Sequence, residues 1–178
     1  MQNIPNLPSQ GFLGSMKYNV DSKNRITIPP DFISILDVAY KFGHRSVITF
    51  FSLNRSIAVF PVASYDHFLQ SIQKKSILDK NMRRLLTMIQ GSSSVQTIDS
   101  QNRLRLSEEL LKHSGIVAKK GSTGEGDARE AYVKGFGDHI EIWAVPVWDK
   151  YIEETLEKVE DISDEVSRSS SDIEPELN

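Results

Sequence analysis

Short stretches of alternating apolar and polar residues run through both halves of the chain, and a period of two is typical of half-buried β-strands. In the first half, residues 45–51 and 56–60 show this pattern on either side of Ser-Leu-Asn-Arg, which predicts two strands joined by a short connection. In the second half, residues 131–134 and 140–143 show it again. The alternation therefore predicts an equivalent pair of strands in each half.

Two polar turns of similar sequence, at 21–25 and 99–103, interrupt further alternating stretches. A short strand follows each turn, Ile26–Ile28 in the first half and Leu104–Leu106 in the second. Because apolar and polar residues alternate on both sides, we expect each turn to close a hairpin between the strand before it and the strand after it.

Helical patterns lie between and after these strands. Ser107 followed by Glu108 and Glu109 is a typical capped helix start. Asp79 and Gly91 predict the first and last turns of a helix that carries several basic residues. The predicted helices begin near Pro30, Ser64, Asp79, Ser107 and Val147. Together, these strands and helices predict an α+β fold.

An internal repeat relates the two halves of the chain. Val20–Ile26 returns 78 residues later as Ile98–Leu104, and Ser56–Asp66 returns 83 residues later as His139–Asp149. Two separate blocks that recur in the same order indicate duplication of one structural unit rather than chance. We therefore expect two tandem units related by a pseudo-two-fold internal repeat.

This repeat divides the chain into five segments. They are a flexible N-terminal arm (1–13), a first repeat unit (14–76), a connecting basic helix (77–91), a second repeat unit (92–156) and an acidic disordered tail (157–178). The tail is polar and acidic, so it cannot bury enough apolar surface to offset its ordering entropy. A glycine- and lysine-rich stretch at 119–127 is expected to form an exposed loop.

Charge is distributed unevenly along the chain. Residues 153–178 hold ten acids and two bases, so the formal charge of −3 separates into −8 for this segment and +5 for residues 1–152. A mildly basic body with an acidic appendage is compatible with a polyanionic partner, but many solvated surfaces have a similar surplus. Charge alone does not decide between these interpretations.

The residue types in the two polar turns are suited to a fixed backbone. Asp21 and Asp99 can accept hydrogen bonds from backbone N–H groups two residues further along, which fixes the bend. Asn24 and Asn102 stand where a positive φ is wanted, and asparagine tolerates that conformation better than other residues except glycine.

Arg25 and Arg103 then return to the strand beside the aspartate of their own turn, within reach of a charge-assisted hydrogen bond. A guanidinium held in one orientation suits bidentate recognition of a phosphate or of a guanine edge. Lys23 adds a point charge to the first turn, and its counterpart Gln101 does not. These residue types therefore make both turns candidates for DNA contact, and the first turn carries more positive charge.

Each of these features also has a purely structural interpretation. An Asp–Arg pair that brackets a tight turn often serves only to stabilise it. The basic cluster that contains Arg83 and Arg84 is equally compatible with a solvated helix face. Trp143 and Trp148 are expected to pack in the core rather than to stack on bases.

The sequence contains no recognisable catalytic or metal-binding pattern. The sequence has no cysteine, so disulfides and thiolate metal sites are excluded, and its four histidines share no ligand spacing. Neither a P-loop nor a Gly-X-Ser-X-Gly elbow occurs. The N-terminus does not resemble a secretory signal, and no apolar run is long enough to span a membrane. We expect a cytoplasmic protein without enzymatic activity, metal or cofactor.

The combination of motifs resembles the MraZ family. It comprises the paired Asp-X-X-X-Arg turns, the Ile26–Pro29 continuation, the arginine-bearing helix and the segment Gly135–Trp143, within about 14–154. The resemblance implies a bacterial, nucleoid-associated transcriptional regulator built from two swapped-hairpin, β-barrel-like units related to AbrB. It also implies a ring, commonly of eight subunits, that binds short direct repeats in double-stranded DNA upstream of its own division and cell-wall genes, usually repressing them.

The sequence departs from this family's usual pattern at three places. Asn24 and Asn102 replace glycines, Ser107 replaces the usual second proline, and the 119–127 stretch and the acidic tail look like additions. The predicted DNA-contacting residues are Asp21, Lys23, Asn24, Arg25, Asp99, Gln101, Asn102, Arg103, Arg83 and Arg84. The alternative that stays open is a protein-interaction or scaffold module that uses the same hairpins.

Overall fold

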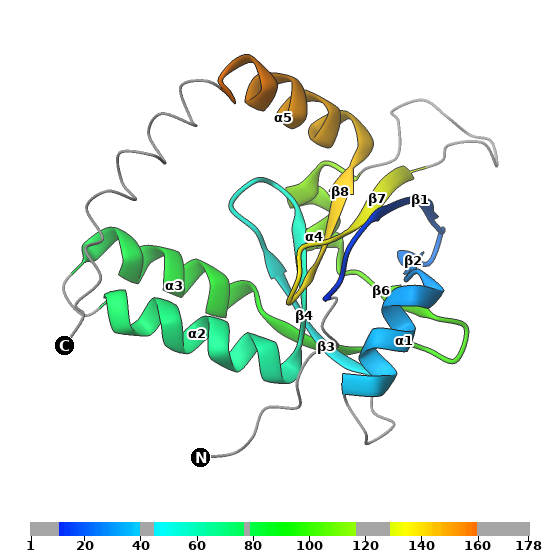
Figure 1. The fold of residues 1–178 in the computed structure, drawn as a ribbon, viewed down its shortest axis with the longest axis horizontal. Helices are drawn as coiled ribbons and strands as arrows, with labels where there is room; N and C mark the ends of the chain where they lie inside the picture. Colours follow the sequence, from blue (N-terminus) through cyan, green and yellow to red (C-terminus); the bar gives the residue numbers. More distant parts are fainter. Residues whose placement is uncertain (1–10, 40–44, 77–78, 117–128, 160–178) are drawn as a thin grey trace, which may run out of the picture. The chain divides into compact units, whose positions relative to one another are not determined.

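The computed structural model of the protein describes residues 11–39, 45–76, 79–116 and 129–159 (Figure 1). Within these ranges the chain forms eight β-strands and five α-helices, which agrees with the predicted α+β class. The expected loop at 119–127, most of the acidic tail and most of the N-terminal arm lie outside the described residues.

A six-stranded antiparallel sheet combines strands from both repeats. Its order is β1 (Ser15–Val20), β7 (Arg129–Gly135), β8 (Ile140–Ala144), β4 (Ile57–Pro61), β3 (Ser46–Phe51) and β5 (Ser94–Thr97). Strands β1, β3 and β4 come from the first repeat, and β5, β7 and β8 are their equivalents in the second. The order is the same when each strand is replaced by its equivalent and the sheet is read from the other end. The repeat therefore has pseudo-two-fold symmetry, and both copies build one sheet.

The strands that follow the polar turns pair with each other rather than with the strands that precede the turns. β2 (Arg25–Thr27) and β6 (Arg103–Arg105) form a separate two-stranded antiparallel ladder, whereas β1 pairs with β7 and β5 pairs with β3. The prediction that each turn closes its own hairpin is therefore wrong. Alternation of side chains identifies a strand and its buried face, but it carries no information about which strand is the partner.

Helix ends follow the capping residues in two cases and depart from the prediction in another. α4 (Glu108–Ser114) begins after its N-cap Ser107, and α3 (Lys80–Ser92) begins after its N-cap Asp79. Gly91 is predicted to end the helix, but α3 continues to Ser92. The hydroxyl of Ser93 donates to the Ile89 carbonyl at 2.7 Å, which satisfies a terminal carbonyl without a left-handed glycine.

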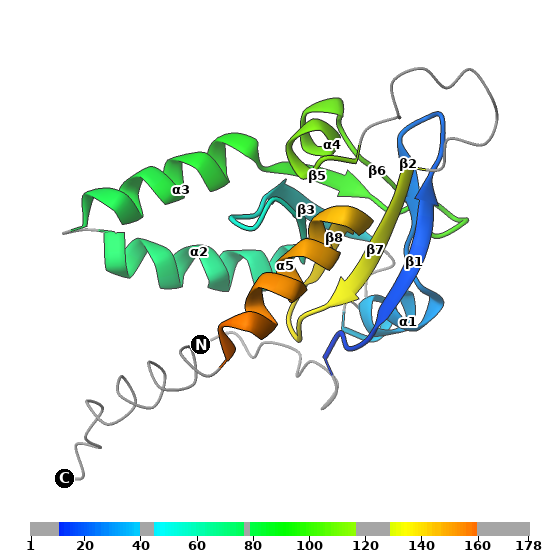
Figure 2. The same cartoon turned by 90° about the horizontal axis from the view of Figure 1, so that it is seen from above.

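Two long helices cover β3 and β4 of the sheet. α2 (Val62–Ser76) and α3 run side by side in two perpendicular views (Figures 1 and 2). Their buried side chains Tyr65, Ile72 and Ile89 pack on Phe50 and Phe60 of β3 and β4. The two shorter helices occupy equivalent positions in the repeats, since α1 (Pro30–Ala39) follows β2 and α4 follows β6.

Individual aromatic residues test the predicted boundaries. Trp143 is 1% exposed and its indole N–H donates to Glu141 at 2.7 Å, which confirms a core position. Phe12 lies within the predicted N-terminal arm, but it is fully buried, and its backbone forms a bridge with Gly137. The ordered chain therefore includes at least the last residues of that arm.

The chain separates into two compact units, residues 1–145 and 146–178. The second unit carries almost all of α5 (Val145–Glu157), which begins two residues before the predicted position. Within it, Trp148 packs against Tyr151 with ring centroids 6.0 Å apart. No helix in the described ranges is both long and apolar enough to cross a membrane.

Candidate nucleic-acid interface

The first polar turn is fixed by its own aspartate. Asp21 Oδ1 accepts hydrogen bonds from the backbone N–H groups of Lys23 and Arg25, both at 2.9 Å. The backbone N–H of Asn24 donates to the Asp21 carbonyl at 3.0 Å, and Asn24 has a φ of 59°. The turn therefore has the geometry that its residue types predict.

The second turn repeats this arrangement. Asp99 Oδ1 accepts from the N–H groups of Gln101 and Arg103, again both at 2.9 Å, and Asn102 has a φ of 60°. Asparagine tolerates this left-handed conformation because its short polar side chain costs less there than a branched or bulky one. Asparagine is therefore compatible with the backbone conformation of both turns.

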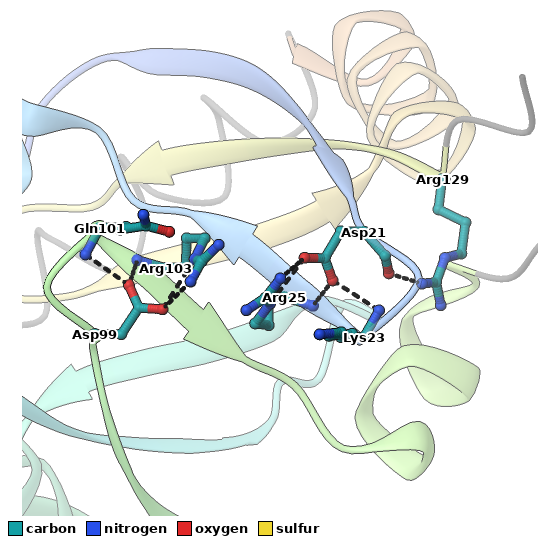
Figure 3. Close-up of polar contacts among 7 residues, drawn as sticks. All are labelled: Asp21, Lys23, Arg25, Asp99, Gln101, Arg103 and Arg129. Atoms are coloured by element: carbon teal, nitrogen blue, oxygen red, sulfur yellow. Dashed lines mark hydrogen bonds and ion pairs between the residues drawn. The ribbon is translucent and has the colours of Figure 1, made fainter. Parts of the chain in front are cut away.

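Each aspartate also holds the arginine of its own turn. Asp21 Oδ2 accepts from Arg25 Nε at 2.8 Å and lies 2.7 Å from Nη2, and the corresponding distances in the Asp99–Arg103 pair are 2.9 and 2.8 Å (Figure 3). The two arginine side chains are 26% and 30% exposed. In each pair both guanidinium nitrogens converge on one carboxylate oxygen, which orients the guanidinium and leaves part of it accessible to a ligand.

The arginines keep both carboxylates ionised. Desolvation alone would raise the pKa of Asp21, but hydrogen bonds from the side chain and backbone of Arg25 outweigh it, so this pKa lies below its ordinary value. Hydrogen bonds from Arg103 likewise lower the pKa of Asp99. Each turn therefore presents an ion pair at neutral pH and not a proton donor.

The two turns lie at opposite ends of the β2–β6 ladder, and each is bonded to the other repeat. The N–H of Leu106 donates to the Asn24 carbonyl and that of Ile28 donates to the Asn102 carbonyl, both at 2.8 Å. The position of either turn therefore depends on the strand that leaves the other one.

Two further arginines, which no sequence pattern indicates, contact the turns. Arg129 donates to the Asn24 side-chain carbonyl at 2.8 Å and also to the Asp21 backbone carbonyl. Arg45 donates to the side-chain carbonyl of Asn102 at 2.7 Å. Each arginine comes from the repeat that does not contain the turn it contacts, so no local motif could indicate its role.

These arginines occupy equivalent positions in the two repeats. Arg129 is the register partner of Val20, which precedes the first turn, and the carbonyl of Arg45 accepts from the N–H of Ile98, which precedes the second. Their surroundings differ, because Arg45 also forms an ion pair with Asp37 at 3.0 Å. The described residues provide no carboxylate partner for Arg129.

The structure does not bring Arg83 and Arg84 to the turns. Both lie exposed in α3, which packs against α2 and β3. In both views α3 and the turn before β2 lie at opposite ends of the first unit (Figures 1 and 2). These two arginines therefore belong to a different surface of the subunit.

A histidine outside the predicted site has a distinct environment. His139 stacks on Phe60, with ring centroids 4.3 Å apart, and its Nδ1 lies 2.7 Å from Asp138. Burial lowers the pKa of His139, but hydrogen bonds to Glu141 and Asp138 outweigh it and raise this pKa above its ordinary value. The ring borders an apolar cleft of about 310 Å³. No group of three side chains suited to a metal ion occurs in the described part of the chain.

Comparison with known proteins matches both halves of the chain to one family. The family described as "MraZ protein, putative antitoxin-like" matches twice, over residues 12–88 and 88–169. These two matches confirm the internal repeat that the sequence predicted.

Curated relatives share the same name and extend over most of the chain. Proteins named "Transcriptional regulator MraZ" from Lactobacillus delbrueckii subsp. bulgaricus and Tropheryma whipplei are each 26% identical over 155 residues, which covers 87% of this chain and 96% of theirs. One from Dictyoglomus thermophilum is 25% identical over 158 residues, 88% of this chain and 96% of its own. The two family matches together span most of the sequence, so this chain belongs to the MraZ family.

Proposed function

We propose that this protein is a sequence-specific DNA-binding transcriptional regulator and that its two polar turns contact the DNA. The observation that carries the proposal is the pair of arginines, Arg25 and Arg103, each held by two bonds to the aspartate of its own turn and each partly exposed. A pre-oriented guanidinium loses less conformational entropy on binding and matches a phosphate or a guanine edge. The curated relatives named as transcriptional regulators support the same function.

The other polar residues of the turns have supporting roles in this proposal. Asp21 and Asp99 orient the arginines, and Asn24 and Asn102 supply the backbone bend. Lys23 contributes a phosphate contact, and Gln101 contributes a hydrogen bond without charge. The crossed pairing of β2 with β6 supports the proposal that the two units adopt the swapped-hairpin, barrel-like arrangement of AbrB-type domains.

A ring of subunits, commonly eight, completes the proposal. A single subunit with a modest positive charge binds a polyanion weakly, whereas several subunits on one DNA molecule act through effective concentration. Subunits related by rotation suit short direct repeats, because a head-to-tail arrangement presents the same face repeatedly. We propose that such repeats lie upstream of the protein's own gene and that binding represses the cluster, in the cytoplasm at the nucleoid.

The turn arginines provide the direct test. Wild-type protein is expected to shift DNA from upstream of its own gene, and unrelated DNA should compete poorly. The Arg25→Ala/Arg103→Ala double variant should lose this shift while its circular dichroism spectrum and oligomeric mass stay unchanged. A folded double variant that binds with wild-type affinity would exclude the turns as the DNA-binding surface.

Arg83 and Arg84 form a separate part of the proposal. They lie away from the turns of their own subunit, so they would contact DNA only if α3 of one subunit lies beside DNA that another subunit binds. The Arg83→Ala/Arg84→Ala variant is therefore expected to weaken binding less than the turn variant. An equal loss would place α3 in the primary interface.

A protein-interaction or scaffold module is the second candidate function. The only observation that favours it is the exposed position of the turns, which a partner protein could also bind. In that case the turn variants would lose a protein partner and retain the same weak, non-specific affinity for DNA as the wild type.

A further inference from the structure

The β2–β6 ladder has one buried face and one polar face. Ile26 and Leu104 lie directly opposite each other and are both fully buried. Because side chains alternate along a strand, the intervening positions lie on the other face. Those positions are Arg25, Thr27, Arg103 and Arg105. Three arginines therefore share one face of a ladder only three residues long.

Arg25 and Arg105 are direct partners in this ladder. The N–H of Leu106 donates to Asn24 and that of Ile28 to Asn102, so the hydrogen-bonded positions alternate with the arginine pair. Residues at such non-hydrogen-bonded positions are the closer ones, typically about 4.5 Å apart at Cα. Like charges directly opposite each other destabilise a sheet. Asp21 offsets the charge of Arg25, so an anion beside this pair would be attracted chiefly by Arg105.

The three arginines differ in how their charge is compensated. Arg25 and Arg103 are each paired with an aspartate, at 2.7 and 2.8 Å. Arg105 is exposed and has neither an ion pair nor a hydrogen-bond partner among the described residues. Arg105 therefore supplies the uncompensated positive charge of this face.

The space beside Arg105 is open to a ligand. Arg105 lines a polar hollow of about 380 Å³ together with Asn24 of the first turn and Glu108 at the start of α4. Glu108 forms no ion pair with Arg105 in the structure. An anion that enters here would contact the first turn and Arg105 at the same time.

We propose that Arg105 is a third DNA-contacting arginine and that it binds the phosphate backbone. This inference rests on the proposed function. Arg25 and Arg103 are oriented by carboxylates, as base recognition requires, whereas Arg105 has no orienting partner in the described chain. An unoriented, uncompensated guanidinium suits phosphate contacts, which position a protein on DNA without reading its sequence.

The repeat supplies a matched test, because the equivalent of Arg105 in the first repeat is Thr27. Arg105→Thr should weaken binding to specific and unrelated DNA by the same factor, severalfold at moderate salt. The slope of log affinity against log salt concentration should become shallower by about 0.9 for each subunit engaged. Thermal unfolding should not occur at a lower temperature, because Arg105 has no ion pair or hydrogen bond among the described residues to lose.

Thr27→Arg is the reciprocal variant. It creates the same like-charge pair opposite Arg103, so it should lower the unfolding temperature and make the salt dependence of DNA binding steeper. Opposite changes in stability and affinity are expected from a ligand contact and not from a structural role.

The outcomes separate this inference from the proposed function. If Arg105→Thr leaves affinity and salt dependence unchanged while Arg25→Ala weakens specific binding, the inference is wrong and the proposed function stands. If Arg105→Thr changes sequence preference and leaves the salt dependence as it was, the phosphate assignment is wrong. If Arg25→Ala, Arg103→Ala and Arg105→Thr all bind as the wild type does, the proposed function fails as well.

Discussion

The two polar turns have nearly the same internal geometry, but the residues around them differ. The aspartate–arginine distances and the asparagine φ angles agree closely between them. Their surroundings differ, because the first turn has Lys23 and is contacted by Arg129, whereas the second has Gln101 and is contacted by Arg45, whose charge Asp37 offsets. Local sequence therefore fixes the conformation of a turn, whereas its electrostatic potential depends both on the residue at its tip and on residues from the other repeat.

Substitution of the arginine in either polar turn is expected to reduce DNA affinity more than any other single change. Arg25→Ala and Arg103→Ala should each reduce specific affinity by roughly 5- to 150-fold, the range for losing a good bidentate contact. The loss should be greater for Arg25→Ala, because the first turn carries more positive charge. The measurement is titration of each variant against the upstream DNA at fixed salt. Equal losses would show that the surroundings of the turns do not affect recognition.

The arginines that contact the turn from the other repeat should have the next largest effect. Arg129→Ala removes two charge-assisted hydrogen bonds to the first turn, and because the site is partly exposed it should lower the free energy of unfolding by about 1 kcal/mol. DNA affinity should fall because Arg25 is positioned less well. Arg45→Ala is the matched variant for the second turn, and urea unfolding compares the two. Wild-type stability for both variants would contradict the proposal that these arginines stabilise the turns.

Exchange of the residues at the tips of the turns should have a smaller effect. Lys23→Gln should weaken binding about threefold and make the salt dependence shallower, as expected for the loss of one phosphate contact. Gln101→Lys should do the reverse, and a double exchange should return the affinity close to that of the wild type. Titrations at several salt concentrations provide the measurement. No change in salt dependence would remove Lys23 from the interface.

A change of pH near neutrality should have the smallest effect on the free energy of unfolding. Both aspartates have a pKa below the ordinary value of 3.8, so the stabilisation that they provide is fully present above that value and is lost as the pH falls through the lowered pKa. The contribution of the turns to the free energy of unfolding should therefore be complete and independent of pH between about pH 5 and 7. Asp21→Asn and Asp99→Asn should each reduce the loss at lower pH, and an unchanged acid transition would contradict the role of the ion pairs.

Much of the fold was predictable because its signals are local. The alternation of side chains gave strands close to their observed bounds, and Asp79 and Ser107 marked helix starts. The end of α3 was predicted less well, since serine hydroxyls replaced the expected glycine stop. The pairing of strands was predicted wrongly, because alternation is the same whichever strand is the partner.

The candidate site divides in the same way. The sequence by itself determined the two turns, because an aspartate, a left-handed asparagine and an arginine within five residues bond to one another whatever surrounds them. Only the tertiary structure brought Arg45 and Arg129 to those turns and placed Arg105 opposite Arg25. These contacts join residues that are 57 or more positions apart, so they exist only because the strands of the two repeats cross.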